Sequence, residues 1–253
     1  MTEPLSLQII GSIGIGGAEH WFGRFARALA ETGGRAELAI RAGSALAKLD
    51  LGSLPLHPLP LRTVWDPLSR MAVKRLIGRV QPDIVQTYMG RATRLTHIKP
   101  GRGPVHVARL GGYFALHPYR HAHAWIGNTQ GLCDWLIRQG LPAGRVYQIY
   151  NFVDQARPVP VEAIQALRAE LGLPDEAWVL VSAGRFAPVK GLGYLVAAMA
   201  ELPATLADRP LHLVLLGEGH LDAELRSQSE ALGLGRRIHW AGWRNETGPF
   251  FQM

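Results

Sequence analysis

The chain opens with an apolar run, residues 5–10, that passes into a glycine-rich turn, 11–17, and then into apolar residues at helical spacing. A continuous apolar run predicts a strand buried on both faces, and the spacing after the turn predicts a helix. Gly33 and Gly34 end that helix, and a second short apolar run, 36–40, follows. Strand, turn, helix and strand in this order predict a right-handed βαβ unit and a parallel sheet.

The same alternation continues along the chain. Further strands are predicted at 82–87, 105–108, 124–129, 146–150, 178–182, 212–216 and 237–240. Further helices are predicted at 66–80, 130–139, 161–171, 192–202 and 221–232. Asp66 and Thr129 are expected to cap the first two of these helices. A proline-containing connector begins near Asp154, so we predict an α/β protein with two Rossmann-like domains, 1–153 and 154–253. The second has three strands and is expected to be incomplete.

Composition narrows the class of protein. With 253 residues and 47% hydrophobic residues, the chain can bury a large core or two smaller ones. No apolar run approaches the roughly 20 residues that span a bilayer, and the first residues lack a signal-peptide pattern, so a cytoplasmic protein is expected. Residues 1–153 carry 18 Lys and Arg against 8 Asp and Glu, whereas 154–253 carry 9 against 12. The first domain is therefore basic, and its partners should be anionic.

A second glycine turn, 184–191, follows the strand predicted at 178–182 and contains two cations, Arg185 and Lys190. A helix start offers unpaired backbone N–H groups and the positive end of the helix dipole. Arginine and lysine add charge-assisted hydrogen bonds to phosphate oxygens. This turn therefore predicts a site for a phosphorylated ligand, a diphosphate above all.

Six motifs in this order carry a family resemblance. They are Gly16-Gly17-Ala18-Glu19, Pro82-Asp83-Ile84-Val85, Ile126-Gly127-Asn128-Thr129, Tyr150-Asn151-Phe152-Val153-Asp154, Gly184-Arg185 with Lys190-Gly191, and Leu216-Gly217-Glu218-Gly219. Each is common by itself, but the set resembles a retaining nucleotide-sugar glycosyltransferase of the GT-B fold, family 4.

The resemblance implies two Rossmann-like domains that face each other across a cleft, with the acceptor on the first and the sugar nucleotide on the second. It implies that Gly16, Gly17, Arg185 and Lys190 bind the donor diphosphate. It places Gly184, Gly217 and Glu218 near the nucleotide. A hexosyl unit would move to an envelope or polysaccharide acceptor, which attacks on the face that the diphosphate leaves. With cations stabilising the leaving group, no metal and no cofactor are expected.

The sequence departs from the family pattern at two places. The family often has a histidine where Gly111 stands here, and His117, six residues on, is the candidate for its catalytic role. The family also carries two glutamates in a segment that would follow Met253. We therefore expect a C-terminally truncated chain of low or no activity, and the alternative is a catalytically silent module that binds a partner.

Other interpretations of the sequence stay open. The basic helix 66–80 fits peripheral contact with the inner membrane surface, but equally an ordinary helix with a wet basic face. The basic first domain also raises a nucleic-acid binder, although no aromatic-basic RNA motif is present. His117, His121 and His123 lack the spacing of a metal site. Core positions are expected for Trp21, Trp125, Trp135 and Trp178.

Overall fold

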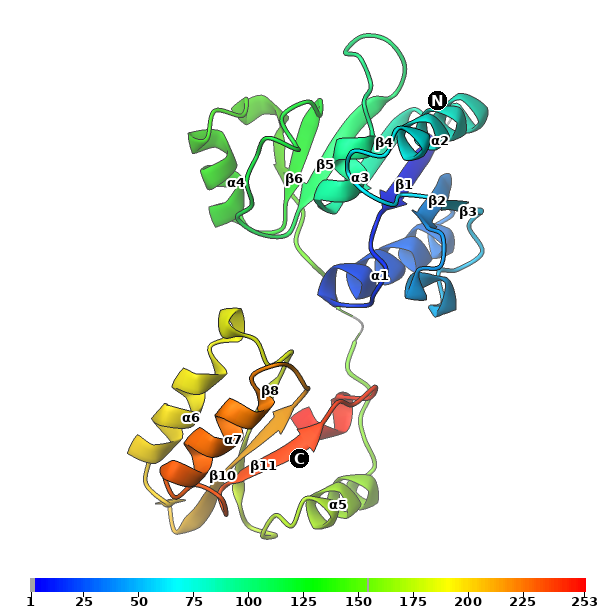
Figure 1. The fold of residues 1–253 in the computed structure, drawn as a ribbon. Helices are drawn as coiled ribbons and strands as arrows, with labels where there is room; N and C mark the ends of the chain where they lie inside the picture. Colours follow the sequence, from blue (N-terminus) through cyan, green and yellow to red (C-terminus); the bar gives the residue numbers. More distant parts are fainter. Residues whose placement is uncertain (1–2, 154) are drawn as a thin grey trace. The chain divides into compact units, whose positions relative to one another are not determined.

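The computed structural model describes residues 3–153 and 155–253, and the chain divides into two compact units, 1–154 and 155–253 (Figure 1). Each unit has its own parallel sheet and its own core. Asp154, where the second domain was predicted to start, lies outside the described residues.

The first unit, as far as it is described, contains a seven-stranded parallel sheet of order β3-β2-β1-β4-β5-β6-β7. Its strands are β1 (Ser6–Ile10), β2 (Ala36–Arg41), β3 (Leu56–Leu59), β4 (Ile84–Tyr88), β5 (Val105–Leu110), β6 (Ala124–Gly127) and β7 (Val146–Gln148). Its helices are α1 (Gly17–Glu31), α2 (Pro67–Val80), α3 (Met89–Leu95) and α4 (Gln130–Arg138), with short 3-10 turns η1 (Ala45–Lys48) and η2 (Ala143–Arg145). The prediction of an α/β fold with a parallel sheet is confirmed.

Helices cover both faces of this sheet (Figure 1). On β1, Leu7 and Ile9 pack with α2 and α3, whereas Ile10 packs with α1 on the opposite face. Successive side chains of a strand point to opposite faces, so a strand covered on both faces must be apolar at nearly every position. This is why Leu7, Ile9 and Ile10 are apolar, whereas the expected continuous run is interrupted at Ser6 and at the buried Gln8, whose Oε1 accepts a hydrogen bond from the Tyr88 hydroxyl at 2.9 Å.

Two helix starts confirm the capping residues expected from the sequence. The Asp66 carboxylate accepts hydrogen bonds from the Leu68 N–H (3.0 Å) and the Ser69 hydroxyl (2.6 Å) at the start of α2. The Thr129 hydroxyl accepts the Leu132 N–H at 3.2 Å and caps α4. Both side chains satisfy N–H groups that a helix leaves without an internal partner.

Two elements of the first unit were missed by the sequence pattern. Strand β3 contains Pro58, which cannot donate to a ladder, but β3 is an edge strand and tolerates it. Helix α3 follows β4 without a loop, and its first residue, Met89, has a positive φ of 65°. With seven residues, α3 is too short to show a helical period in the sequence.

The second unit, within its described residues, has three parallel strands in the order β11-β10-β8, with a short β9 antiparallel to β10. The strands are β8 (Trp178–Ala183), β9 (Thr205–Leu206), β10 (Arg209–Leu216) and β11 (Ile238–Gly242). The helices are α5 (Val161–Glu170), α6 (Leu192–Glu201) and α7 (Asp222–Ala231), with 3-10 turns η3 (Pro188–Lys190) and η4 (Gly248–Phe251). Helices α6 and α7 pack on one face of the sheet, and α5 packs on the other (Figure 1).

Strand β8 is an edge of this sheet, because β10 is its one partner among the described residues. Trp178 is 44% exposed and Leu180 is 40% exposed on it. The guanidinium of Arg209 lies over the Trp178 ring, 4.2 Å from its centroid. The prediction that Trp178 lies in a core is therefore wrong, since an edge strand leaves one flank of its side chains uncovered.

Candidate functional site

The loops that follow β8 and β10 in the second unit run side by side beyond the ends of their strands. The Gly184 N–H donates to the Leu216 carbonyl and the Phe186 N–H to the Glu218 carbonyl, both at 2.9 Å. The Gly217 N–H donates to the Gly242 carbonyl at 2.8 Å and joins the end of β11 to them. These loops form the carboxyl edge of the sheet, where open α/β folds bind their ligands.

Glycine is required at two positions for the loops to approach this closely. A Cβ on Gly217 would lie 2.0 Å from the Gly184 carbonyl oxygen, and its φ of +126° excludes other residues as well. A Cβ on Gly219 would lie 2.3 Å from the Phe186 carbonyl oxygen. Gly217 was predicted to lie near the nucleotide, whereas Gly219 was missed as a site residue. Its signal was the paired glycines around Glu218.

The direction of Arg185 is set by its neighbour. Phe186 is buried and packs edge-on against Trp240, with 6.1 Å between ring centroids. Arg185 directly precedes Phe186, so the burial of Phe186 fixes the backbone from which the Arg185 side chain extends. Arg185 is exposed at the carboxyl edge of the sheet.

Lys190 folds back onto the same loop. It ends the 3-10 turn η3, and its alkyl carbons lie within 3.8–4.0 Å of the position that a Cβ on Gly184 would take. Gly191 then adopts a left-handed conformation (φ +65°) and begins α6. The expected strand-to-helix turn is therefore present, with a 3-10 turn inserted, and it brings Lys190 beside the residue that precedes Arg185.

Both cations are free to bind an anion. Across residues 3–153 and 155–253, neither Arg185 nor Lys190 has a hydrogen-bond or ion-pair partner for its side chain. Glu218 is also exposed at this edge, and its Oε1 lies 3.9 Å from the position of a Cβ on Gly242. Two unpaired cations at the start of a helix, with a carboxylate that can accept hydroxyl hydrogen bonds, suit a phosphorylated sugar derivative.

The glycine turn of the first unit is built differently. Gly16 precedes α1, and its N–H donates to the Glu19 carboxylate at 2.9 Å. No atom lies within 4 Å of the position that a Cβ on Gly17 would take. The remaining amides of the first turn have no partner within the helix, so this turn can also receive an anion. The buried Glu19 opposes this with a negative charge of its own.

An arginine that the sequence analysis did not single out lies at this turn. The Arg91 guanidinium donates from Nη1 to the Gly11 carbonyl at 2.9 Å, and its alkyl chain packs on Gly11. Burial, together with the positive charge of Arg41, lowers the pKa of Arg91 from its usual value. A guanidinium stays charged in a protein, so Arg91 places a cation at the carboxyl edge of the first sheet. Its signal was its place in the basic first domain.

His117 lies in the long segment between β5 and β6 and is exposed. Its Nε2 is 3.3 Å from Nη1 of Arg94. Since a guanidinium can only donate, Nε2 accepts this hydrogen bond and the proton of the neutral ring is on Nδ1. The nitrogen that a general base would use is therefore already engaged. The catalytic role of His117 stays a prediction.

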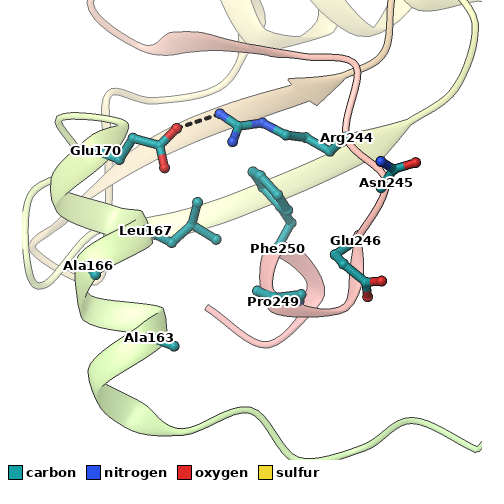
Figure 2. Close-up of a pocket in the computed structure, with 9 residues that line it drawn as sticks. All are labelled: Ala163, Ala166, Leu167, Glu170, Arg244, Asn245, Glu246, Pro249 and Phe250. Carbon is teal, nitrogen blue, oxygen red and sulfur yellow. Dashed lines mark hydrogen bonds and ion pairs between the residues drawn. The ribbon is translucent and has the colours of Figure 1, made fainter.

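A cavity of about 530 Å³ lies in the second unit between α5 and the last residues of the chain. Figure 2 shows Leu167 and Phe250 at its floor and the ion pair of Arg244 with Glu170 at its rim. These contacts pack the end of the chain against α5. The described residues contain no group of three His, Cys, Asp or Glu side chains placed to hold a metal ion, and none of their helices is long and apolar enough to cross a bilayer.

Comparison with known proteins gives two family matches that together cover most of the chain. Residues 15–157 match the profile described as "Glycosyltransferase Family 4", and residues 163–252 match "Glycosyl transferases group 1". The lipopolysaccharide core biosynthesis glycosyltransferases LpsE and LpsD of Rhizobium meliloti (strain 1021) are 31% and 30% identical over 93% of this chain. The chain spans 66% and 65% of the lengths of these two relatives.

Solved structures agree on the fold. The Anabaena protein HepE, solved with UDP and glucose, superposes with a TM-score of 0.76 at 21% identity, over 98% of this chain and 72% of that one. A glycosyltransferase from Rickettsia africae ESF-5 gives a TM-score of 0.78 at 15% identity, over 99% and 71%. The predicted GT-B architecture is confirmed. With each of its units matched by one of the two profiles, this chain belongs to the family 4 (group 1) glycosyltransferases of the GT-B fold.

Proposed function

We propose that the chain is the nucleotide-sugar-binding part of a glycosyltransferase, whose donor diphosphate is bound by Arg185 and Lys190. The observation that carries this proposal is the pair of cations on one loop, exposed and without a partner in the described chain. Two cations on one loop raise the local affinity for phosphate. Names of two relatives, LpsE and LpsD, point to an acceptor in the lipopolysaccharide core.

The proposed chemistry needs little beyond charge stabilisation. The bond between the sugar C1 and the diphosphate oxygen breaks, and negative charge builds on the leaving diphosphate. Arg185 and Lys190 stabilise this charge more strongly in the transition state than in the bound donor, which is the condition for catalysis. An acceptor hydroxyl oxygen bonds to C1 on the face that the diphosphate leaves, so the anomeric configuration is retained. The hydroxyl proton passes to the diphosphate, and no metal or cofactor is required.

The other site residues have proposed roles of their own. The nucleoside contacts Gly184, Gly217 and Glu218, and the Glu218 carboxylate accepts hydrogen bonds from the ribose hydroxyls. Gly16 and Gly17 offer first-turn amides of α1 to a phosphate. His117 is proposed to act on the acceptor side. His117→Gln tests this role, because reduced sugar transfer with unchanged nucleotide binding would support it, and unchanged transfer would remove it.

The donor site is tested by measuring UDP and GDP binding to the chain, to Arg185→Ala and to Lys190→Ala. Charged hydrogen bonds contribute about 1.5–3 kcal/mol, so each variant should bind the preferred nucleotide about ten- to a hundred-fold more weakly. Arg236→Ala is the matched control, since Arg236 is an exposed cation just before β11, at the opposite edge of the same sheet. Equal binding by all four proteins would remove the site from these residues.

The acceptor is proposed to be a glycan or a lipid-linked glycan of the cell envelope, reached from the cytoplasmic side. Peripheral contact with the inner membrane would bring the protein to such an acceptor. The alternative is a silent module. Saturable nucleotide binding without release of sugar from UDP- or GDP-sugars, in the presence of purified lipopolysaccharide core acceptors, would favour the module over the transferase.

A further inference from the structure

The first unit contains a second cavity, of about 800 Å³, away from the glycine turns. It lies between α2 and the loop that follows α3, residues 97–104. Its lining includes Pro82 and Asp83, just before β4, and Pro104, just before β5. It therefore lies at the amino edge of the sheet, whereas substrates of open α/β folds bind at the carboxyl edge. A ligand here would be distinct from the donor and the acceptor.

The rim of this cavity is strongly basic. Arg70 and Lys74 come from α2, and Lys99 and Arg102 come from the loop. In the described part of the chain none of these four side chains has a hydrogen-bond or ion-pair partner. The carboxylate in the lining, Asp83, already accepts the Leu5 N–H at 2.8 Å. Four cations without a partner around one cavity favour the binding of an anionic ligand.

The floor of the cavity is apolar. Val73 and Leu95 are buried members of the core under α2 and α3, and Ile77 and Ile98 pack against the same core. Gly78 also faces the cavity, and nothing lies within 4 Å of the position that its Cβ would take. A basic rim above an apolar floor matches a ligand that is anionic at one end and apolar at the other.

The surface beside the cavity fits a bilayer. The α2 residues that line the cavity follow one another at helical spacing, and Met71 and Leu68 occupy the next stripe of the helix. Met71 is 42% exposed and Leu68 is 54% exposed. Exposed apolar side chains next to lysine and arginine on a surface helix are typical of segments that lie at the membrane interface.

We propose that this cavity binds the headgroup of an anionic phospholipid in a bilayer, with Lys74 and Arg102 on the phosphate and the apolar floor under the glycerol and first acyl carbons. The proposal deepens the proposed peripheral membrane contact by giving it a site and a lipid class. It does not depend on the donor site, because the two lie on different units of the chain.

The first test compares cosedimentation with vesicles of phosphatidylcholine and with vesicles of mixed phosphatidylcholine and phosphatidylglycerol. Each basic residue near an anionic surface contributes about 1 kcal/mol, so Lys74→Gln/Arg102→Gln should bind the mixed vesicles about thirty-fold more weakly. Lys48→Gln/Arg145→Gln makes the same change in net charge at exposed positions outside the cavity. Equal losses in the two double variants, or equal binding to both kinds of vesicle, would overturn the proposal.

A second test separates a formed pocket from diffuse surface charge. Gly78→Gln fills the cavity without changing charge, and replacing glycine inside a helix should not destabilise it. Gly144→Gln is the control, since a Cβ there also meets nothing within 4 Å. We expect at least a five-fold loss of binding for Gly78→Gln alone. Unchanged binding, or tighter binding to double-stranded DNA than to the mixed vesicles, would contradict a lipid pocket.

Two further measurements distinguish failure of the lipid proposal from failure of the proposed donor site. Arg185→Ala should bind the mixed vesicles as the unchanged chain does, and Lys74→Gln/Arg102→Gln should bind UDP or GDP as the unchanged chain does. Loss of vesicle binding in Arg185→Ala would mean that the donor loop, and not this cavity, carries the lipid contact.

Discussion

Glycines follow β1 in the first unit and β10 in the second unit, but they differ in what they do. In the second unit, Gly217 and Gly219 allow two loops to touch, and a Cβ on either would overlap a carbonyl oxygen. In the first unit, Gly14 and Gly17 have nothing within 4 Å of a Cβ position. The protein itself thus requires glycine at 217 and 219, and it leaves space around Gly14 and Gly17.

This difference distinguishes glycines that the fold requires from glycines that leave room for a ligand. A glycine that packs on the backbone is required for folding, with or without a ligand. A glycine with open space around it has no such requirement, so its role must come from something that approaches from outside. Gly17 at the start of α1 fits the second description, and Gly217 fits the first.

The largest expected effect is that of Gly217→Ala. The 2.0 Å approach to the Gly184 carbonyl and the φ of +126° should together destabilise the second unit by about 4 kcal/mol. Urea unfolding, monitored through hydrogen exchange of the β10 amides, measures this loss of stability. Gly235→Ala in the same unit, where a Cβ meets nothing within 4 Å, is the control and should change little. A Gly217→Ala protein as stable as the control would break the comparison.

The second expected effect concerns buried histidines, which both units contain. His106 in β5 is fully buried, and burial lowers its pKa to about 3. Its unfolded form takes up a proton near pH 6.5, so between these values the unfolded state binds one more proton. Because of this residue, the unfolding free energy should therefore fall by about 1.4 kcal/mol for each pH unit from pH 6 down to about pH 3.

His106→Gln isolates that contribution, because glutamine can still face the Thr87 hydroxyl, 3.0 Å from Nε2, but does not titrate. As the pH is lowered from 6 to 4, the unfolding free energy of this variant should fall less steeply, because its unfolding takes up one proton fewer. In the second unit His212 and His239 share a hydrogen bond of 2.8 Å, and burial also lowers the pKa of both. If the unfolding free energies of the unchanged chain and of His106→Gln depend on pH with identical slopes, His106 is not the group that titrates.

A smaller effect is expected for Glu170→Gln. Its ion pair with Arg244 lies at a partly exposed rim, and such pairs contribute about 0.2–1 kcal/mol. The loss should appear as a slight decrease in the urea midpoint of the second unit and should vanish at high salt. A loss above about 2 kcal/mol would show that the pair holds the end of the chain against α5 more firmly than its exposure implies.

The smallest effect is expected for Gly17→Ala. Alanine favours the helix by up to about 1 kcal/mol, and no atom of the chain obstructs its Cβ. Stability should stay the same or rise slightly, whereas nucleotide binding should weaken if a phosphate approaches this turn. Stability and nucleotide binding, measured together, sharpen the comparison. If Gly17→Ala were destabilised, Gly17 would be required for folding, as Gly217 is.

Much of the fold was predictable because periodicity and capping are local. The apolar run before Gly11, the Asp66 cap of α2 and the Thr129 cap of α4 each lie where the pattern placed them. Strand β3 and helix α3 were missed because a proline at a sheet edge and a seven-residue helix give no local signal. At the candidate site, Arg185 and Lys190 were predicted from their place in a glycine turn, but Arg91 was not.

The sequence by itself determined most of the strands and helices and their order, the two glycine turns and the cations in the second one, because each depends on residues close together in the chain. The tertiary structure decided which loops touch. It put the Gly217 backbone against Gly184, the Arg91 guanidinium on the Gly11 carbonyl and the loop 97–104 beside α2. These contacts join residues far apart in the chain, and their geometry depends on how whole strands pair and how helices pack on them.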